Sequence, residues 1–373
     1  MRKATLALAD GTVFEGLGFG AAGETSGEVV FNTSMSGYQE ILTDPSYVGQ
    51  MICMTYPEQG NYGTNRADAE SSRVHATGFI VRHHAEQPSN FRAEEGLEAY
   101  LVRNGIVGIH GIDTRRLTRH IRNTGAQMGV IASEGSPRAL VDRARSLPGM
   151  EGQDLATRIS TPAPYAWTET GADAWTDEER RTVEAPRFHV VAYDWGLKRA
   201  MLRLLAQAGC RVTVVPSRTS AAEALALAPD GVFLTNGPGD PAAVEGARDT
   251  VASLLGKVPV FGICLGHQIL SLALGASTYK LKFGHRGANQ PVKDLATGKV
   301  DITAQNHGFA VDDRSLGKRA RVSHVNLNDG TVEGIEVLDA PAFGVQYHPE
   351  SSPGPHDARH LFGRFVEMME RGR

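Results

Sequence analysis

The sequence has little cysteine and no long apolar segment, and each shortage excludes a class of protein. Only three cysteines occur among the 373 residues, Cys53, Cys210 and Cys264. A sparse, odd number argues against a scaffold of structural disulfides and fits a reducing compartment. No apolar run approaches the roughly eighteen residues that cross a bilayer, and Asp10 interrupts the apolar start too early for a signal peptide. We therefore expect a cytoplasmic protein without a membrane anchor.

The chain also lacks an excess of charge of either sign. It contains 38 Lys and Arg against 42 Asp and Glu, a formal net charge of −4. Such a balance gives no reason to expect nucleic acid or a membrane surface as a partner. His83 and His84 have no cysteine or carboxylate partner at a ligand-like spacing, so no metal site is expected.

The length predicts two domains, and the composition indicates where they meet. Residues 151–186 mix proline, glycine, charge and scattered aromatic residues without a sustained period, which is typical of an interdomain linker. The segment separates an N-terminal domain, 1–150, from a C-terminal domain, 187–373. In the first, short β-rich runs between glycine-rich turns, followed by two helical patterns, predict an α+β fold.

The C-terminal domain alternates strand and helix patterns, beginning with the strand HVVAYDW at 189–195. Repeated strand–helix–strand units predict an α/β fold, with a parallel sheet flanked by helices on both faces. Ligands bind such sheets at the carboxyl ends of the strands, so the candidate residues are expected there.

Gly262-Ile-Cys264-Leu-Gly266 follows an apolar run and precedes a helical pattern. This is the layout of a nucleophile elbow with Cys in place of Ser. A helix that begins at the thiol favours the thiolate through its free N–H groups and its dipole. A buried cysteine beside a glycine turn is the alternative interpretation, and the strand–elbow–helix context disfavours it.

A cysteine nucleophile needs a base and a residue that orients the base. In His348-Pro349-Glu350, an extended backbone places His348 and Glu350 on the same side, and Pro349 prevents a helix. We interpret His348 as the proton carrier and Glu350 as its orienting partner. A surface turn with an incidental charge is the alternative.

Two further segments have the residues of a substrate site. Asn-Gly-Pro-Gly-Asp at 236–240 follows a strand and forms an open turn whose backbone N–H groups could stabilise an oxyanion. An ordinary strand-to-helix turn would explain that motif equally well. Gln-Asn-His-Gly-Phe at 305–309 offers amide hydrogen bonds from Asn306 and an apolar wall from Phe309.

Together, GICLGHQ at 262–268, NGPGD at 236–240 and HPE at 348–350 resemble the class I, triad-type glutamine amidotransferases. FNTSMSGYQEILTDPSYVGQ at 31–50, GIDTRRLT at 111–118 and HPESSPGPHD at 348–357 resemble more narrowly the small, glutamine-hydrolysing subunits of carbamoyl-phosphate synthase. The likeness covers nearly the whole chain, and it includes the N-terminal domain.

The resemblance implies a role for individual residues. Cys264 would attack the amide carbon of L-glutamine, His348 would pass the proton to the leaving ammonia, and Glu350 would orient His348. The implied substrate contacts are Ser46, Gly237, Gly239, Leu265, Gln268, Asn306, Gly308 and Phe309.

The resemblance also implies a partner. The ammonia would pass to a carbamoyl-phosphate synthase large subunit in a heterodimer, and the N-terminal domain would dock that subunit. ATP and a divalent metal would be used by the large subunit, and no cofactor is expected in this chain. The product would serve arginine and pyrimidine synthesis. The alternatives are another triad amidotransferase, a cysteine hydrolase with the same elbow, and a non-catalytic assembly module.

Overall fold

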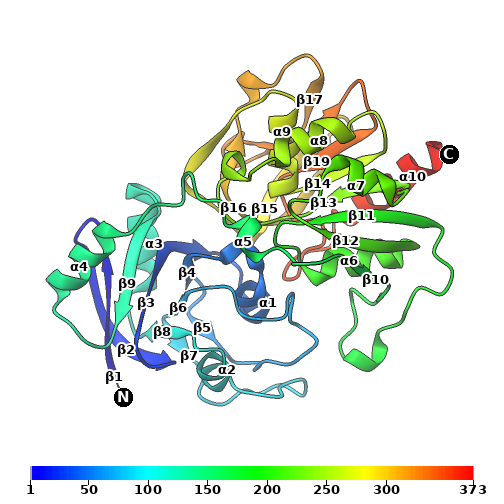
Figure 1. The fold of residues 1–373 in the computed structure, drawn as a ribbon. Coiled ribbons are helices and arrows are strands. Elements are labelled where there is room, and N and C mark those ends of the chain that lie inside the picture. Colours follow the sequence, from blue (N-terminus) through cyan, green and yellow to red (C-terminus); the bar gives the residue numbers. More distant parts are fainter. Residues whose placement is uncertain (1, 373) are drawn as a thin grey trace. The chain divides into compact units, whose positions relative to one another are not determined.

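Residues 2–372 are described by a computed structural model and form two compact units (Figure 1). The first unit contains the chain up to Glu151 together with Lys282–Arg286, and the second contains Gly152–Leu281 and the chain from Gly287. The segment Lys282–Arg286, which belongs to the first unit, lies within one long strand, β15 (Thr278–Asp294).

The first unit is built on a closed seven-stranded barrel. Its strands β3, β4, β6 and β8 pair in parallel, and the remaining neighbours pair antiparallel. In order around the barrel the strands are β1 (Arg2–Leu8), β2 (Val13–Gly20), β8 (Val107–His110), β6 (Gly78–Ile80), β4 (Gln50–Met54), β3 (Glu24–Asn32) and β9 (Gln127–Ala132). A two-stranded sheet of β5 (Glu58–Gln59) and β7 (His83–His84) lies outside the barrel order.

Alternating side chains explain how the barrel strands pack. Along β1, Leu6 and Leu8 belong to one buried cluster, whereas Ala7 between them packs in another with Leu140 of α4 (Pro137–Ser146). Successive strand residues point to opposite faces, so a single strand can contact both the barrel interior and an outer helix. The other helices of this unit are α1 (Tyr38–Thr43), α2 (Leu97–Arg103), α3 (Thr114–Thr124) and the short 3₁₀ turn η1 (Pro45–Tyr47).

The α+β composition of the first unit is confirmed. The sequence did not predict that its strands close into a barrel. Strand β2 has no clear sequence pattern because glycine occupies alternate positions in Gly16, Gly18 and Gly20. A side chain at Gly16 would place its Cβ 2.5 Å from the carbonyl oxygen of His110. Glycine here permits close strand approach, and the same lack of side chains removes the hydrophobic alternation by which a strand is recognised.

The second unit contains a ten-stranded mixed sheet. Its order is β10 (Tyr165–Trp167), β12 (Cys210–Pro216), β11 (Phe188–Asp194), β13 (Gly231–Leu234), β14 (Val260–Ile263), β19 (Ala342–Val345), β18 (Val332–Val337), β17 (Ala320–Asn326), β15 and β16 (Val300–Val311). The central strands β12, β11, β13, β14 and β19 are parallel, as the alternating pattern predicted.

Helices cover both faces of this parallel sheet. Val190 and Ala192 of β11 share a buried cluster with α6 (Arg199–Gln207) and α10 (His360–Arg371). Val191 and Tyr193 share the other cluster with α7 (Ala221–Ala226), α8 (Ala247–Leu254) and α9 (Leu265–Ala273). The predicted α/β class of this unit is therefore confirmed.

The segment 151–186, whose composition suggested a linker, contributes elements to the second unit. It contains α5 (Ala156–Ile159), β10 and the 3₁₀ turn η2 (Asp177–Glu179). Strand β10 pairs antiparallel with β12, and Trp167 packs against the buried cluster beneath it. An edge strand three residues long has too short a pattern to be distinguished from an irregular connection.

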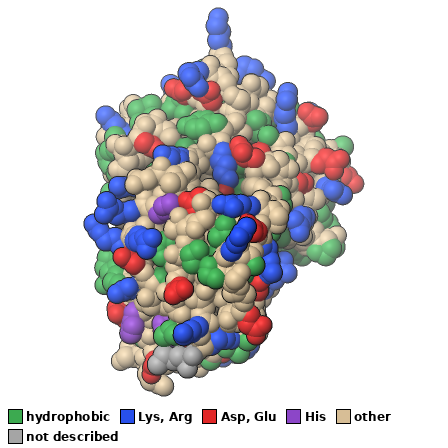
Figure 2. Space-filling view, turned by 90° about the vertical axis from the view of Figure 1, so that its left-hand side faces the viewer, with side chains coloured by type: hydrophobic (Ala, Val, Ile, Leu, Met, Phe, Trp, Pro, Cys, Tyr) green, Lys and Arg blue, Asp and Glu red, His purple; other side chains and the backbone are tan. Residues whose placement is uncertain are grey.

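Among residues 2–372, no helix has the length and apolar character needed to span a membrane. On the face drawn in Figure 2, Lys and Arg side chains are interspersed with Asp and Glu side chains.

Candidate active site

Cys264 lies in the sharp turn between β14 and α9, at the N-cap of the helix. Its backbone has φ 53° and ψ −106°, a strained combination for a residue with a side chain. The two flanking glycines are required by space. A Cβ at Gly262 would lie 2.8 Å from the carbonyl carbon of Gly266, and one at Gly266 would lie 2.2 Å from the oxygen of Leu234. The turn therefore has the geometry of a nucleophile elbow.

His348 and Glu350 follow β19, the strand that pairs with β14. The backbone N–H of Cys264 donates to the oxygen of Val345 at 2.9 Å, which ties the elbow to the end of β19. Nδ1 of His348 lies 2.7 Å from Oε1 of Glu350, and both side chains are at most 3% exposed. The three predicted triad residues thus meet at the carboxyl ends of two adjacent strands.

The ion pair between His348 and Glu350 determines which ring nitrogen of His348 carries the proton. Since ionised Glu350 can only accept, the Nδ1–H of His348 donates to it, and Nε2 is left for the thiol. Burial alone would lower the pKa of His348, but the charge of Glu350 and the hydrogen-bonding interaction with Cys264 outweigh burial and raise it. The imidazole is therefore suited to hold the proton that Cys264 gives up.

Lys198 is a fourth buried member that the sequence interpretation did not include. Its Nζ donates to Oε1 of Glu350 at 2.9 Å and to the backbone oxygen of Ser351. Burial would raise the pKa of Glu350, but Lys198 and then His348 overcome it and lower the pKa to about 2. Glu350 therefore stays ionised across the physiological range.

The turn that delivers Lys198 is held by Asp194, the last residue of β11. One carboxylate oxygen accepts the backbone N–H groups of Gly196 and Leu197, at 3.0 and 3.2 Å. The other accepts the N–H of Thr161 at 2.7 Å, from the segment 151–186. Burial raises the pKa of Asp194, although these three backbone donors oppose the rise. A sequence signal existed, because Asp194 and Lys198 flank the carboxyl end of a parallel strand.

The turn after β13 requires glycine at two positions. Gly239 has φ +90°, and a Cβ at Gly237 would lie 2.1 Å from the carbonyl oxygen of Trp195 and 2.7 Å from the side chain of Leu265. Leu265 is the first residue of α9, where helix geometry leaves the N–H without an intrahelical acceptor. Gly237 and Leu265 therefore come together beside Cys264.

The remaining predicted contacts of this unit lie on α9 and β16. Sγ of Cys264 lies 3.7 Å from the backbone oxygen of Asn306. Nε2 of Gln268 donates to the backbone oxygen of Phe309 at 2.8 Å. Gly308 lies between Asn306 and Phe309 on β16. The strand is fixed near the triad because the N–H of His348 donates to the oxygen of Ala304 at 2.8 Å.

Ser46 belongs to the first unit and is described there alone. It lies in η1, is 6% exposed, and its backbone N–H donates to the carboxylate of Asp44 at 2.9 Å. Its part in binding glutamine stays a prediction.

The comparisons with known proteins first define a class. Residues 191–368 match the family model described as glutamine amidotransferase class-I. That range contains the elbow, the His348–Glu350 pair and Lys198. The alternatives of a cysteine hydrolase with the same elbow and of a non-catalytic assembly module are therefore not favoured.

The first unit narrows the assignment. Residues 6–131 match the family model described as carbamoyl-phosphate synthase small chain, CPSase domain. Carbamoyl phosphate synthase small chains of Syntrophotalea carbinolica, Ralstonia nicotianae and Escherichia coli K12 are 58%, 56% and 53% identical to this chain. The matches cover 100%, 98% and 100% of this chain, and 99%, 97% and 99% of those proteins. The chain belongs to the carbamoyl-phosphate synthase small chain family.

Proposed function

We propose that this chain hydrolyses L-glutamine and supplies the ammonia to a carbamoyl-phosphate synthase large chain. The single observation that carries the proposal is the buried Cys264–His348–Glu350 arrangement at the elbow of an amidotransferase domain. The small-chain domain in the first unit selects this role among the many that a glutaminase domain can have.

The proposed reaction uses the residues in sequence. The Cys264 thiolate attacks Cδ of glutamine, a sulfur–carbon bond forms, and the amide oxygen becomes an oxyanion. Backbone N–H groups of Gly239 and Leu265 would stabilise that charge. His348 gives its proton to the leaving nitrogen, the carbon–nitrogen bond breaks, and ammonia departs. A water molecule, deprotonated by His348, then hydrolyses the γ-glutamyl thioester to glutamate and restores the thiol.

The substrate contacts are part of the same proposal. Asn306, Gly308 and Phe309 on β16, with Gln268 on α9 and Gly237 on the oxyanion turn, would surround the glutamine. Ser46 would add a hydroxyl hydrogen bond. The support for these six residues is the family resemblance together with the contacts that bring five of them near Cys264.

The partner and the compartment are part of the same proposal. The large chain would form a heterodimer with this chain, and it would hold the ATP and the divalent metal that convert bicarbonate and ammonia to carbamoyl phosphate. This chain would need no cofactor of its own. The free Cys264 thiol needs a reducing environment to remain active, which favours the cytoplasm.

The first unit, at residues 1–150 in the sequence-based division, would be the docking surface for the large chain. The triad and Lys198 all lie in the second unit, so the bond-making and bond-breaking steps need no side chain of the barrel unit. The small-chain match falls on the barrel, which is the part that a glutaminase alone does not require.

Glutamate release from glutamine tests the proposal. The purified chain should hydrolyse glutamine slowly alone and much faster with a large chain, ATP and bicarbonate. Cys264→Ser should lower kcat at least about a thousand-fold, whereas Cys210→Ala, in strand β12, should not. Ser46→Ala should raise the glutamine KM. Hydrolysis that survives Cys264→Ser would overturn the mechanism, full-speed hydrolysis indifferent to the large chain would overturn the partner, and an unchanged KM would remove Ser46 from the site.

A further inference from the structure

Two glutamine side chains meet behind the elbow, and the mechanism above uses only one of them. Nε2 of Gln268, on the second turn of α9, donates to Oε1 of Gln346 at 2.9 Å as well as to the backbone oxygen of Phe309 at 2.8 Å. Gln346 follows β19, two residues before His348. Gln268 and Gln346 are 3% and 0% exposed.

These contacts determine which way the Gln268 amide faces. A primary amide has two N–H donors and one carbonyl acceptor. The oxygen of Phe309 can only accept, so Nε2 of Gln268 must face it. The second N–H of Gln268 is then met by Oε1 of Gln346. Both donors are therefore used, and Oε1 of Gln268 is directed away from them as an acceptor.

An acceptor at this position can reach the ammonium group of an amino acid substrate whose amide lies at Cys264. Gln268 is four residues after Cys264, and its backbone N–H donates to the oxygen of Cys264 at 3.1 Å. The two positions are therefore close at the start of the helix, about 6 Å apart along its axis at 1.5 Å per residue. An extended glutamine spans roughly 5 Å between its amide carbon and its α-nitrogen, given carbon–carbon bonds of about 1.5 Å.

Gln346 has no other visible task. Its own Nε2 is buried and has no hydrogen-bond partner anywhere in residues 2–372. A buried amide with an unused donor is less favourable than an apolar side chain of the same size. The contact to Gln268 is the feature that distinguishes glutamine from such a side chain here.

We propose that Gln346 is a positioning residue that holds Gln268 with its Oε1 toward the α-ammonium of the substrate, and so makes the site select an α-amino acid amide. The inference rests on the proposed function and deepens it. It concerns binding, since neither amide touches the sulfur or the leaving nitrogen.

The test compares glutamine with its deamino analogue, 4-carbamoylbutanoate, which keeps the amide and the carboxylate. Gln346→Met keeps the size of the side chain and removes the acceptor. We expect the glutamine KM to rise about tenfold while kcat stays within about twofold, which corresponds to the loss of one hydrogen bond to a charged group. The KM of the analogue should not change, because that substrate has no ammonium group with which Gln268 could form a hydrogen bond.

Two further variants separate positioning from simple destabilisation. Gln346→Glu retains an oxygen that can accept from Gln268 and should restore much of the glutamine KM. In a Gln268→Met background, Gln346→Met should add nothing, because the residue through which it acts is gone. Equal rises of KM for both substrates, or additive effects in the double variant, would overturn the inference.

The proposed function can fail separately. If the unchanged protein releases no glutamate, with or without the large chain, the glutaminase assignment is wrong. If the unchanged protein is active and Gln346→Met has the same glutamine KM, only the role of Gln346 is wrong.

Discussion

At the scale of single residues, charge rather than shape distinguishes this site from an ordinary buried turn. Glu350 is fully buried and is paired with both Lys198 and His348. Removing either partner would leave a buried charge without compensation. The ordering is useful chemically, since Lys198 keeps Glu350 ionised and Glu350 in turn favours the protonated form of His348. Lys198, Glu350 and His348 thus form a row of alternating charges beside the thiol of Cys264.

Replacing Glu350 with glutamine tests this arrangement of charges through the pH dependence of kcat/KM. Burial lowers the pKa of His348 and Glu350 raises it, with a net rise, so the imidazolium of the unchanged protein persists to higher pH. In Glu350→Gln the introduced amide would still accept a hydrogen bond but would carry no charge, so the pKa of His348 should fall. The alkaline limb of the profile should therefore move to lower pH by about one unit or more. Glu336→Gln, which alters a carboxylate paired with Arg321, is the matched control. An alkaline limb that stays in place would show that Glu350 does not govern the proton on His348.

The sequence predicted the three triad residues and Gln268, but it did not predict their contacts with Lys198 and Gln346. Cys264 lies in a local glycine motif, and His348 and Glu350 are two positions apart, so both signals are short-range. Lys198 reaches Glu350 across 152 positions of the chain, and Gln268 reaches Gln346 across 78. Contacts of that length depend on strand order in the sheet, which local patterns do not contain.

At the scale of elements, the turn between β14 and α9 holds the nucleophile only because glycine flanks it. Gly266→Ala would place a Cβ 2.2 Å from the oxygen of Leu234, which is backbone and cannot move aside easily. We expect this variant to lose most of its glutaminase activity and to unfold at a lower temperature. Activity is measured by glutamate release and stability by thermal unfolding.

Gly363→Ala provides the control for that substitution. Gly363 is exposed within α10, and a Cβ there would meet nothing within 4 Å. Alanine should stabilise the helix by about 0.5–1 kcal/mol with unchanged activity. If Gly266→Ala were as harmless as Gly363→Ala, the close packing at the elbow would not constrain the nucleophile.

Element prediction succeeded where the hydrophobic period was long and failed where it was short or masked. The alternation of strands and helices that was predicted from residue 189 onward is confirmed from β11 to α9. Strands β2, β8 and β9 were missed, because glycines interrupt their alternation, as at Gly108 and Gly129. Helix α4 begins with a recognisable Ser136 cap and Pro137, so that signal was present and unused.

At the scale of the whole molecule, closure of the barrel could not be predicted because it depends on pairings between distant strands. Strand β9 pairs with both β1 and β3, and β8 pairs with β2 and β6. The resemblance to a family therefore added what local reasoning lacked, namely a task for the first unit. The docking proposal makes that task testable.

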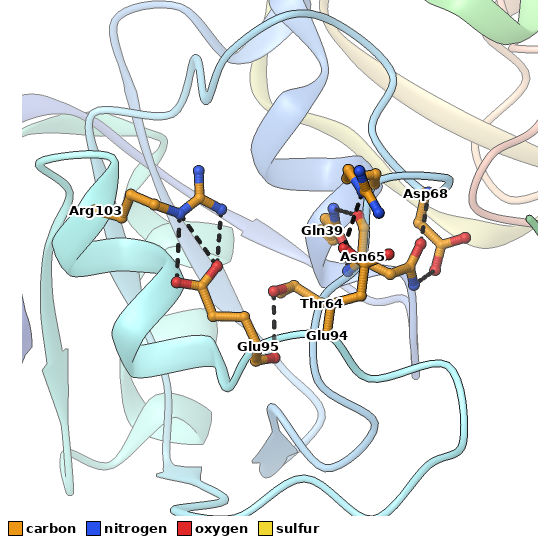
Figure 3. Close-up of polar contacts among 8 residues, drawn as sticks. Gln39, Thr64, Asn65, Asp68, Glu94, Glu95 and Arg103 are labelled. Atoms are coloured by element: carbon orange, nitrogen blue, oxygen red, sulfur yellow. Dashed lines mark hydrogen bonds and ion pairs between the residues drawn. The ribbon is translucent and has the colours of Figure 1, made fainter. Parts of the chain in front are cut away.

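In the first unit, polar contacts connect two loops that carry a candidate docking residue (Figure 3). The Gln39 side chain both donates to the oxygen of Asn65 and accepts its N–H, and Asn65 donates to Asp68 at 2.8 Å. Thr64 pairs with the backbone of Glu95 at 2.8 Å, and Arg92 pairs with Asp68. These contacts hold together the two loops at 60–68 and 90–95.

The loop 90–95 displays Phe91, which is 83% exposed. Exposed aromatic residues on a rigid support are typical anchors of protein interfaces. We expect Phe91→Ala to weaken binding to the large chain about tenfold or more, and to leave unassisted glutamate release unchanged because the triad lies in the other unit. Binding is measured by titrating the large chain and following the acceleration of glutamate release.

Leu338→Ala is the control for Phe91→Ala, since Leu338 is 57% exposed and lies in the second unit. Removing a similar exposed apolar side chain there should leave the titration unchanged. If Leu338→Ala shifted the midpoint and Phe91→Ala did not, docking would belong to the amidotransferase unit, and the barrel would need another explanation. If Phe91→Ala alone shifts it, the extra domain of this family is a recognition module that directs the ammonia from a glutaminase to one particular synthase.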